Sequence, residues 1–214
     1  NPTPTPTPTP DTNTGSAIEF TGNLEIGQVV VSINNGMVAV WYRRSPDNTV
    51  YVGNGTVGAK GAVSFDLHAV DNAADKIPFA GTYQYTQATG VQTFELTQLT
   101  ASYPYAPVPL TNKHQGNVAG YQKNFVRYVE NLKNGLNGKN DIAATFFITL
   151  DTDKVQIVAV YGNSDIGMAS VSKSANLEGN VVRTKMKLGK AEFLITLKFN
   201  EDTRDGSGND DDNT

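Results

Sequence analysis

The sequence contains no cysteine, only two histidines, His68 and His114, and a single tryptophan, Trp41. Without cysteine there can be no disulfide and no zinc site built on thiolates, and two histidines are too few for a site built on several imidazoles. A Ser-His-Asp triad would have to use one of these two residues, and neither lies in a motif that indicates one. We therefore predict no metal site and no catalytic residue.

Other signs of chemistry are equally sparse. Asp151 and Asp153 have the spacing of turn residues rather than of the paired carboxylates of a glycosidase. No glycine-rich loop follows a strand and opens a helix to hold a phosphate. Haem ligation by His68 or His114 stays open as an alternative, because imidazole is a common axial ligand. The main expectation is a binding protein that is not an enzyme and carries no cofactor.

Long apolar runs are also missing. The 214 residues are 38% hydrophobic, and no stretch is long enough to span a membrane as a helix. The net charge of -4 is unevenly distributed: residues 111–200 carry 12 basic and 7 acidic groups, whereas residues 201–214 carry 1 and 6. The second half is thus locally basic and the tail acidic. That asymmetry can steer an acidic macromolecule toward the second half, or it can simply solvate strand faces.

The two ends of the chain have the composition of unstructured segments. Residues 1–10 alternate threonine and proline after Asn1, which favours an extended rod, and we predict a tether over residues 1–16. Such tethers occur as linkers in secreted polysaccharide-degrading enzymes and as stalks of bacterial lipoproteins. We expect a mature or trimmed form, with N-terminal lipidation as a hypothesis. Residues 201–214 are predicted to be a disordered acidic tail, with Ca²⁺ binding as the alternative.

Residues 17–103 read as an N-terminal β domain, a twisted sheet or small sandwich. Its clearest feature is a hairpin around Asn35-Gly36, where positive φ is needed, flanked by alternating apolar residues. Trp41 shares a face with Met37 and Ala39 and is predicted to be in the core. Further strands are expected at 49–53, 62–67, 81–86 and 91–99, with turns at Asn54-Gly55 and Thr89-Gly90.

Residues 104–112 are predicted to be a linker, because Pro104, Pro107 and Pro109 disfavour a central strand. Beyond this linker, residues 113–200 are expected to form one short amphipathic helix and an antiparallel β-barrel. The helix is predicted from apolar residues that recur at helical spacing between Tyr121 and Leu136.

The barrel prediction rests on strands that alternate apolar and polar residues from residue 141 to residue 199. Apolar residues recur at every second position from 144 to 150, before the turn Asp151-Thr152-Asp153, and again from 155 to 161, after that turn. The last two runs place Val182, Met186 and Leu188 opposite Arg183, Lys185 and Lys187, and Phe193, Ile195, Leu197 and Phe199 opposite Thr196 and Lys198. The predicted fold class is therefore mainly β.

Candidate binding residues come from aromatic and basic side chains that dominate interfaces. Three patches meet this description. Each also has a structural explanation that needs no partner: solvation of a strand edge for the first, local packing for the second, and the polar face of a barrel for the third. The patches are Tyr42, Arg43 and Arg44; Tyr103 and Tyr105; and the basic stripe of Arg183, Lys185, Lys187 and Lys198.

The tether, the two β regions and two strand segments together resemble a known family. The segments are Ser-Ala-Asn-Leu-Glu-Gly-Asn at 174–180 and Ala-Glu-Phe-Leu-Ile-Thr-Leu-Lys-Phe at 191–199. They are similar to the surface lipoproteins of Gram-negative bacteria typified by factor-H-binding protein and the lobes of transferrin-binding protein B. Family barrels commonly end in a hairpin containing Phe-Gly or Gly-Gly, whereas here Phe199 runs into Asn200-Glu201-Asp202.

This resemblance implies a non-enzymatic lipoprotein of the outer membrane, exported by a dedicated translocator and facing the extracellular side. The implied partner is a host serum protein, with a complement regulator favoured and immune evasion as the role. Capture of transferrin, haemoglobin or haem for iron uptake is the alternative. A carbohydrate-binding module of a secreted hydrolase is the second alternative, although a core Trp41 would not serve to stack on sugars. We expect no nucleic-acid partner, and membrane contact only through the hypothetical lipid anchor.

Overall fold

A computed structural model describes residues 18–34, 36–45, 47–112, 125–132, 142–151, 154–163, 167–188 and 191–198. The chain divides into two compact units, residues 1–118 and residues 119–214. The predicted tether 1–16, the acidic tail 201–214 and His114 lie outside the described residues. No helix in the described part of the chain is long and apolar enough to cross a membrane.

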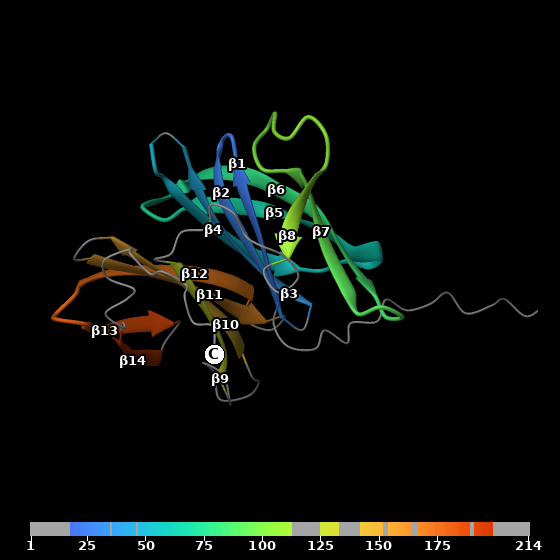
Figure 1. The fold of residues 1–214 in the computed structure, drawn as a ribbon. Coiled ribbons are helices and arrows are strands. Elements are labelled where there is room, and N and C mark those ends of the chain that lie inside the picture. The colour runs from blue at the N-terminus through green and yellow to red at the C-terminus, as the bar shows by residue number, and fades with distance from the viewer. Residues whose placement is uncertain are drawn as a thin grey trace, which may run out of the picture. The chain divides into compact units, whose positions relative to one another are not determined.

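The first unit contains an eight-stranded closed antiparallel β-barrel (Figure 1). Each strand pairs with the next along the chain, and β8 closes the barrel on β1 through the pairs Phe20↔Asn112 and Thr21↔Thr111. The strands are β1 Ile18–Leu24, β2 Gly27–Asn34, β3 Met37–Arg44, β4 Val50–Thr56, β5 Ala62–Ala69, β6 Asn72–Thr86, β7 Val91–Gln98 and β8 Val108–Asn112, with a short 3-10 turn η1 at Ala59–Gly61. A sheet closed in this way leaves no open edge.

Large side chains fill the barrel. Phe94 stands at the centre of an aromatic cluster, with its ring centroid 5.8 Å from that of Phe20 and 6.1 Å from that of Phe79. A Cβ at position 81 would overlap the Phe94 ring, so only glycine fits there. Eight strands give an interior just wide enough to be filled by side chains, and these residues belong to one contiguous core.

The predicted N-terminal hairpin is confirmed. Asn34 pairs with Met37, so the turn has two residues, and Gly36 has a φ of 75°, in the left-handed region that favours glycine. Asn35 lies outside the described residues. The four shorter predicted strands correspond to β4, β5, β6 and β7, and Gly90 lies in the predicted turn with a φ of 68°. The turn predicted at Asn54-Gly55 is wrong, because both residues continue β4.

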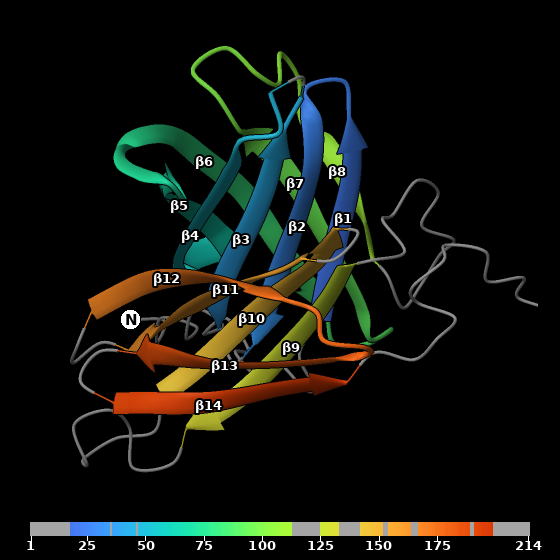
Figure 2. The same cartoon turned by 90° about the vertical axis from the view of Figure 1, so that its left-hand side faces the viewer.

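The second unit contains a four-stranded antiparallel sheet in the order β12-β11-β10-β9 and a separate hairpin β13-β14 (Figure 2). The strands are β9 Phe125–Leu132, β10 Ile142–Asp151, β11 Lys154–Asn163, β12 Gly167–Asn176, β13 Val181–Leu188 and β14 Ala191–Lys198. One face of β10 and β11 shares an aliphatic core with the hairpin, including Ile148, Ile157, Val182 and Met186. The alternation predicted for β13 and β14 is confirmed, whereas β10 and β11 bury side chains on both of their faces, as Ile157 and Val158 show.

Three details of the predicted fold are wrong. The mainly β class is confirmed, but the closed barrel is in the first unit, where we expected an open sheet or a sandwich. The described strands of the second unit form the sheet and the hairpin rather than a closed barrel. The segment expected to be a linker, 104–112, contains β8. Pro109 is paired with Glu95 of β7 but with no residue of β1, because only Thr111 and Asn112 of β8 pair with β1, and a proline is tolerated more easily where one side of a strand is unpaired.

The predicted helix is also wrong, because its described part, Phe125–Leu132, is strand β9. Apolar residues at 125, 129 and 132 fit a helical period, but Val126 and Tyr128 between them also favour a strand. β11 occupies one edge of β10, and β9 pairs with the other from Phe125↔Thr149 to Leu132↔Ile142. Pairing with a long neighbouring strand outweighs a weak local helical preference.

Candidate binding surfaces

The first predicted patch, at the end of β3, is not an accessible binding surface. Tyr42 is fully buried in the barrel core, so its prediction as a contact residue is wrong. Its hydroxyl donates a hydrogen bond to the Ile26 carbonyl oxygen at 2.7 Å, and its ring stacks on Tyr51 with centroids 6.1 Å apart. Burial raises the pKa of Tyr42 to about 12. The alternation of β3 explains the error, since Val38, Val40 and Tyr42 share the inward face.

The two arginines of this patch differ. Arg43 is half-buried on β3. Arg44 is committed to internal contacts, with Nη2 2.6 Å from Oδ2 of Asp47 and the guanidinium 5.0 Å from the centre of the Tyr51 ring. The hydrogen bonds from Arg44 hold the pKa of the Asp47 carboxyl well below its usual range. The Tyr51 hydroxyl in turn donates to Oδ2 of Asp75 at 2.9 Å. Arg44 therefore serves the fold of the barrel end.

Trp41 is almost completely buried, as predicted. It lies on the face of β3 opposite to Val40 and Tyr42 and does not belong to the barrel core cluster. A buried indole cannot form the exposed platform on which sugar-binding modules stack their ligands.

The second predicted patch lies on the loop between β7 and β8. Tyr105 is 92% exposed, whereas Tyr103 is half-buried and packs against the barrel core. The loop is held by its own backbone, because the Leu99 amide donates to the Tyr103 carbonyl oxygen at 2.7 Å and Thr100 bridges Tyr103. Burial raises the pKa of Tyr103, so its hydroxyl stays protonated at neutral pH. The structure thus presents one exposed tyrosine on an anchored loop.

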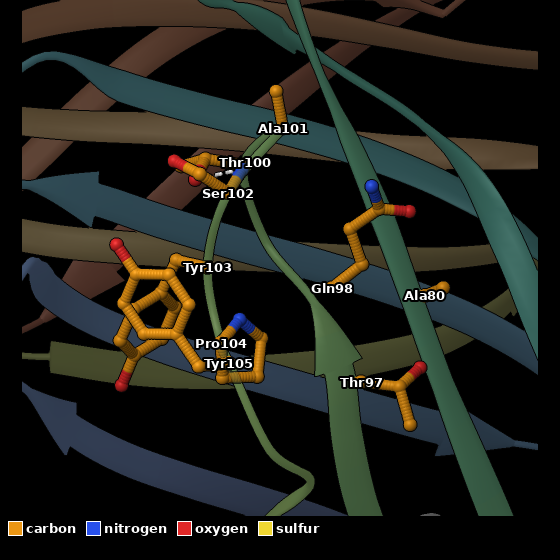
Figure 3. A pocket seen from close by; sticks show the side chains of 9 residues that line it. All are labelled: Ala80, Thr97, Gln98, Thr100, Ala101, Ser102, Tyr103, Pro104 and Tyr105. Atoms are coloured by element: carbon orange, nitrogen blue, oxygen red, sulfur yellow. Dashed lines mark hydrogen bonds between the residues drawn. The ribbon is translucent and has the colours of Figure 1, made fainter.

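This loop borders an open pocket of about 340 Å³ (Figure 3). Ala80 of β6, and Thr97 and Gln98 of β7, line one part of it. The loop supplies the remaining lining residues, which are Thr100, Ala101, Ser102, Tyr103, Pro104 and Tyr105. The sequence indicates only the two tyrosines of this pocket. The turn that brings Thr100 and Ser102 beside Gln98 has no characteristic sequence pattern.

The third predicted patch is the outward face of hairpin β13–β14, which we call the basic hairpin face. Arg183, Lys185 and Lys187 of β13 and Lys198 of β14 are exposed on it, as their alternation predicts. The antiparallel register places Arg183 opposite Thr196, Lys185 opposite Leu194 and Lys187 opposite Glu192. The opposite face carries Val182, Met186 and Leu188, which are buried in the core of the second unit. The structure therefore brings all four predicted cations together.

Two further residues belong to this face and were missed. Leu194 is 69% exposed, which is unusual for leucine, and it lies directly across from Lys185. Glu192 accepts a hydrogen bond from Nζ of Lys185 at 3.0 Å, and this bond lowers the pKa of the Glu192 carboxyl. The sequence does contain the pattern that places these two residues. Phe193, Ile195 and Leu197 recur at every second position on the inner face, so Glu192 and Leu194 must lie on the outer face.

The candidate haem ligand His68 is exposed on β5, and its Nδ1 lies 2.9 Å from the Ala73 carbonyl oxygen. Among the described residues, no three His, Asp or Glu side chains gather in a way that could hold a metal ion. No family model, no curated protein and no solved structure matches this chain. The two surfaces with distinctive chemistry in the described part of the chain are the pocket beside the β7–β8 loop and the basic hairpin face.

Proposed function

We propose that this chain is a non-enzymatic surface protein that captures an acidic host serum protein through the basic hairpin face. The observation that carries the proposal is the composition of that face, on which the described residues include four cations, Arg183, Lys185, Lys187 and Lys198, and one carboxylate, Glu192. Three positive charges are left over on a single hairpin. An excess of this kind attracts an acidic partner and accelerates its association.

Leu194 gives this face an apolar centre. It is exposed beside Lys185, while the hairpin already buries a full apolar face against the core of the second unit. Within the part of the chain that the structure describes, the core of the second unit therefore does not include the Leu194 side chain. An apolar residue surrounded by cations is suited to an interface, because a partner can desolvate the leucine while its carboxylates pair with the surrounding charges.

The resemblance to Gram-negative surface lipoproteins supports a more specific setting for this function. We propose a lipid anchor ahead of the Thr-Pro tether, display on the extracellular side of the outer membrane, and a complement regulator as the favoured partner. Mass spectrometry of the N-terminal peptide from the native protein tests the anchor. An acylated N-terminus is expected, and an unmodified one would remove the anchor from the proposal without affecting the hairpin.

The binding experiment uses the full chain, immobilised and exposed to whole serum, followed by mass spectrometry and by affinity measurement with the retained protein. The double variant Arg183→Gln/Lys187→Gln should weaken the affinity by about thirtyfold, because two charge contacts near water contribute about 2 kcal/mol together. The matched control is Lys154→Gln/Lys173→Gln, which changes the net charge equally at two exposed lysines of the sheet. Equal affinities of the two double variants would contradict the proposal.

A further inference from the structure

We propose that the pocket beside the Tyr103–Pro104–Tyr105 loop binds a neutral sugar ring. This site belongs to the first unit and does not depend on the basic hairpin face of the second. Its volume of about 340 Å³ lies at the lower end of the range of small-molecule sites, which suits one or two sugar rings better than a large cofactor.

The pocket is preorganised by the barrel. Ala80 in the middle of β6 and the end of β7 supply one part of its wall, and the loop supplies the rest. The loop is fixed by the hydrogen bond from the Leu99 amide to the Tyr103 carbonyl oxygen, by the Thr100–Tyr103 bridge and by the packing of Tyr103 on the barrel core. The Ser102 amide also lies 3.4 Å from Oγ1 of Thr100. A ligand that enters therefore has little loop ordering to induce.

The chemistry of the lining selects a ligand with many neutral polar groups. Thr97, Gln98, Thr100 and Ser102 supply hydroxyl groups and an amide, each able to donate and to accept. None of the nine lining residues carries a formal charge at neutral pH, since none is Asp, Glu, Lys, Arg or His and a tyrosine hydroxyl is protonated at that pH. A phosphorylated or carboxylated ligand would find no counter-ion among them, and a purely apolar ligand would bury their polar groups without partners.

The aromatic and proline rings supply the complementary surface. Figure 3 shows Tyr103, Pro104 and Tyr105 on the loop and Gln98 on the neighbouring strand β7, so the lining combines aromatic, apolar and polar groups. A pyranose has the matching character, with C–H groups on its ring face and hydroxyl groups around its edge. Because Tyr105 is 92% exposed, its ring has a free face on which such a sugar can stack.

The test is binding of the full chain to an array of neutral glycans, followed by saturation-transfer NMR with methyl glycosides of glucose, galactose and mannose. We expect Tyr105→Ala to weaken the binding of the selected sugar by about tenfold and Tyr105→Phe to retain it, since the ring and not the hydroxyl makes the stacking contact. Val91→Ala is the control, because it truncates another exposed apolar residue of the barrel.

Gln98→Leu tests the polar wall separately and should also weaken binding, with circular dichroism checking that each variant is folded. Failure of every neutral glycan to bind, or binding that Tyr105→Ala leaves unchanged, would overturn the proposal. The outcome is distinguishable from failure of the proposed function, because serum capture through the hairpin should be the same for wild type and Tyr105→Ala.

Discussion

The cations of the two units are used differently. In the first unit, Arg44 pairs with Asp47 at 2.6 Å and Lys76 with Asp66 at 3.0 Å, so these charges are balanced locally. On the basic hairpin face of the second unit, Lys185 pairs with Glu192, while three further cations share that face. The comparison separates cations that each have a carboxylate partner from a group of four cations that share one carboxylate, and we propose that this excess is available to a partner. It also locates the charge-driven surface on the second unit and the uncharged pocket on the first.

The largest expected effect tests whether the barrel is a filled core rather than a container for a ligand. Phe94→Ala removes the ring that contacts Phe20 and Phe79 and should lower the free energy of unfolding by about 3–5 kcal/mol, because a cavity remains. Denaturant titration measures this loss. Val91→Ala on the same strand is the control and should cost far less, since Val91 is 40% exposed. Equal losses for both variants would argue against a tightly packed interior.

The next effect is the response of the first unit to alkaline pH. The pKa of Tyr42 is raised to about 12 in the folded state, whereas an unfolded tyrosine titrates near 10. The folded protein therefore holds the proton more tightly, and its stability is complete below pH 10 and falls as the pH rises toward 12. A shift of this size corresponds to about 2–3 kcal/mol.

Stability measured against pH tests this expectation. Tyr42→Phe should remove most of the alkaline loss, because phenylalanine does not ionise. Burial also raises the pKa of Tyr51 and Tyr83 in the first unit, which adds a smaller dependence of the same sign. An unchanged alkaline slope in Tyr42→Phe would show that Tyr42 is not the group responsible.

A matched pair of arginine substitutions tests the division between paired and available cations. Arg183→Gln should weaken binding of the retained serum protein by about fivefold, the effect of one contact charge near water of about 1 kcal/mol. Arg44→Gln should leave that affinity unchanged, because Arg44 is engaged with Asp47 and Tyr51. Surface plasmon resonance with the purified partner measures both. A loss with Arg44→Gln equal to that with Arg183→Gln would remove the distinction.

The smallest effect concerns Glu192, the acidic residue among the four cations. Glu192→Gln breaks its ion pair with Lys185, but both side chains are well exposed, so the free energy of unfolding should hardly change. Binding of an acidic partner should become slightly tighter, because the net charge of the face increases. Weaker binding would mean that Glu192 itself contacts the partner.

Much of the secondary structure was predictable because a strand records its buried face directly as alternation. β13 and β14 follow this pattern, whereas β2 and β3 were recognisable as nearly continuous apolar runs, because both of their faces are buried. Closure of the barrel was not predictable, since it depends on β1 pairing with β8, which are far apart in the chain. β9 was misassigned because the apolar residues Phe125, Val129 and Leu132 fit a helical period as well as a strand.

The same rule explains the candidate sites. The basic hairpin face was predictable because Arg183, Lys185 and Lys187 alternate with buried Val182 and Met186. Alternation with Val38 and Val40 could also have placed Tyr42 inside the barrel. The pocket could not be predicted from the sequence. Its polar lining comes from an irregular loop, in which inward- and outward-facing residues do not alternate as they do in a strand.

The most direct test of the account is capture from whole serum by the immobilised full chain across a series of salt concentrations. The account predicts that an acidic serum protein is retained at physiological salt and released as salt rises, because screening weakens contacts between exposed charges. It also predicts that Arg183→Gln/Lys187→Gln shifts this release to lower salt, while Lys154→Gln/Lys173→Gln does not. No retained protein, or retention that is independent of salt, would contradict the assignment of binding to the basic hairpin face.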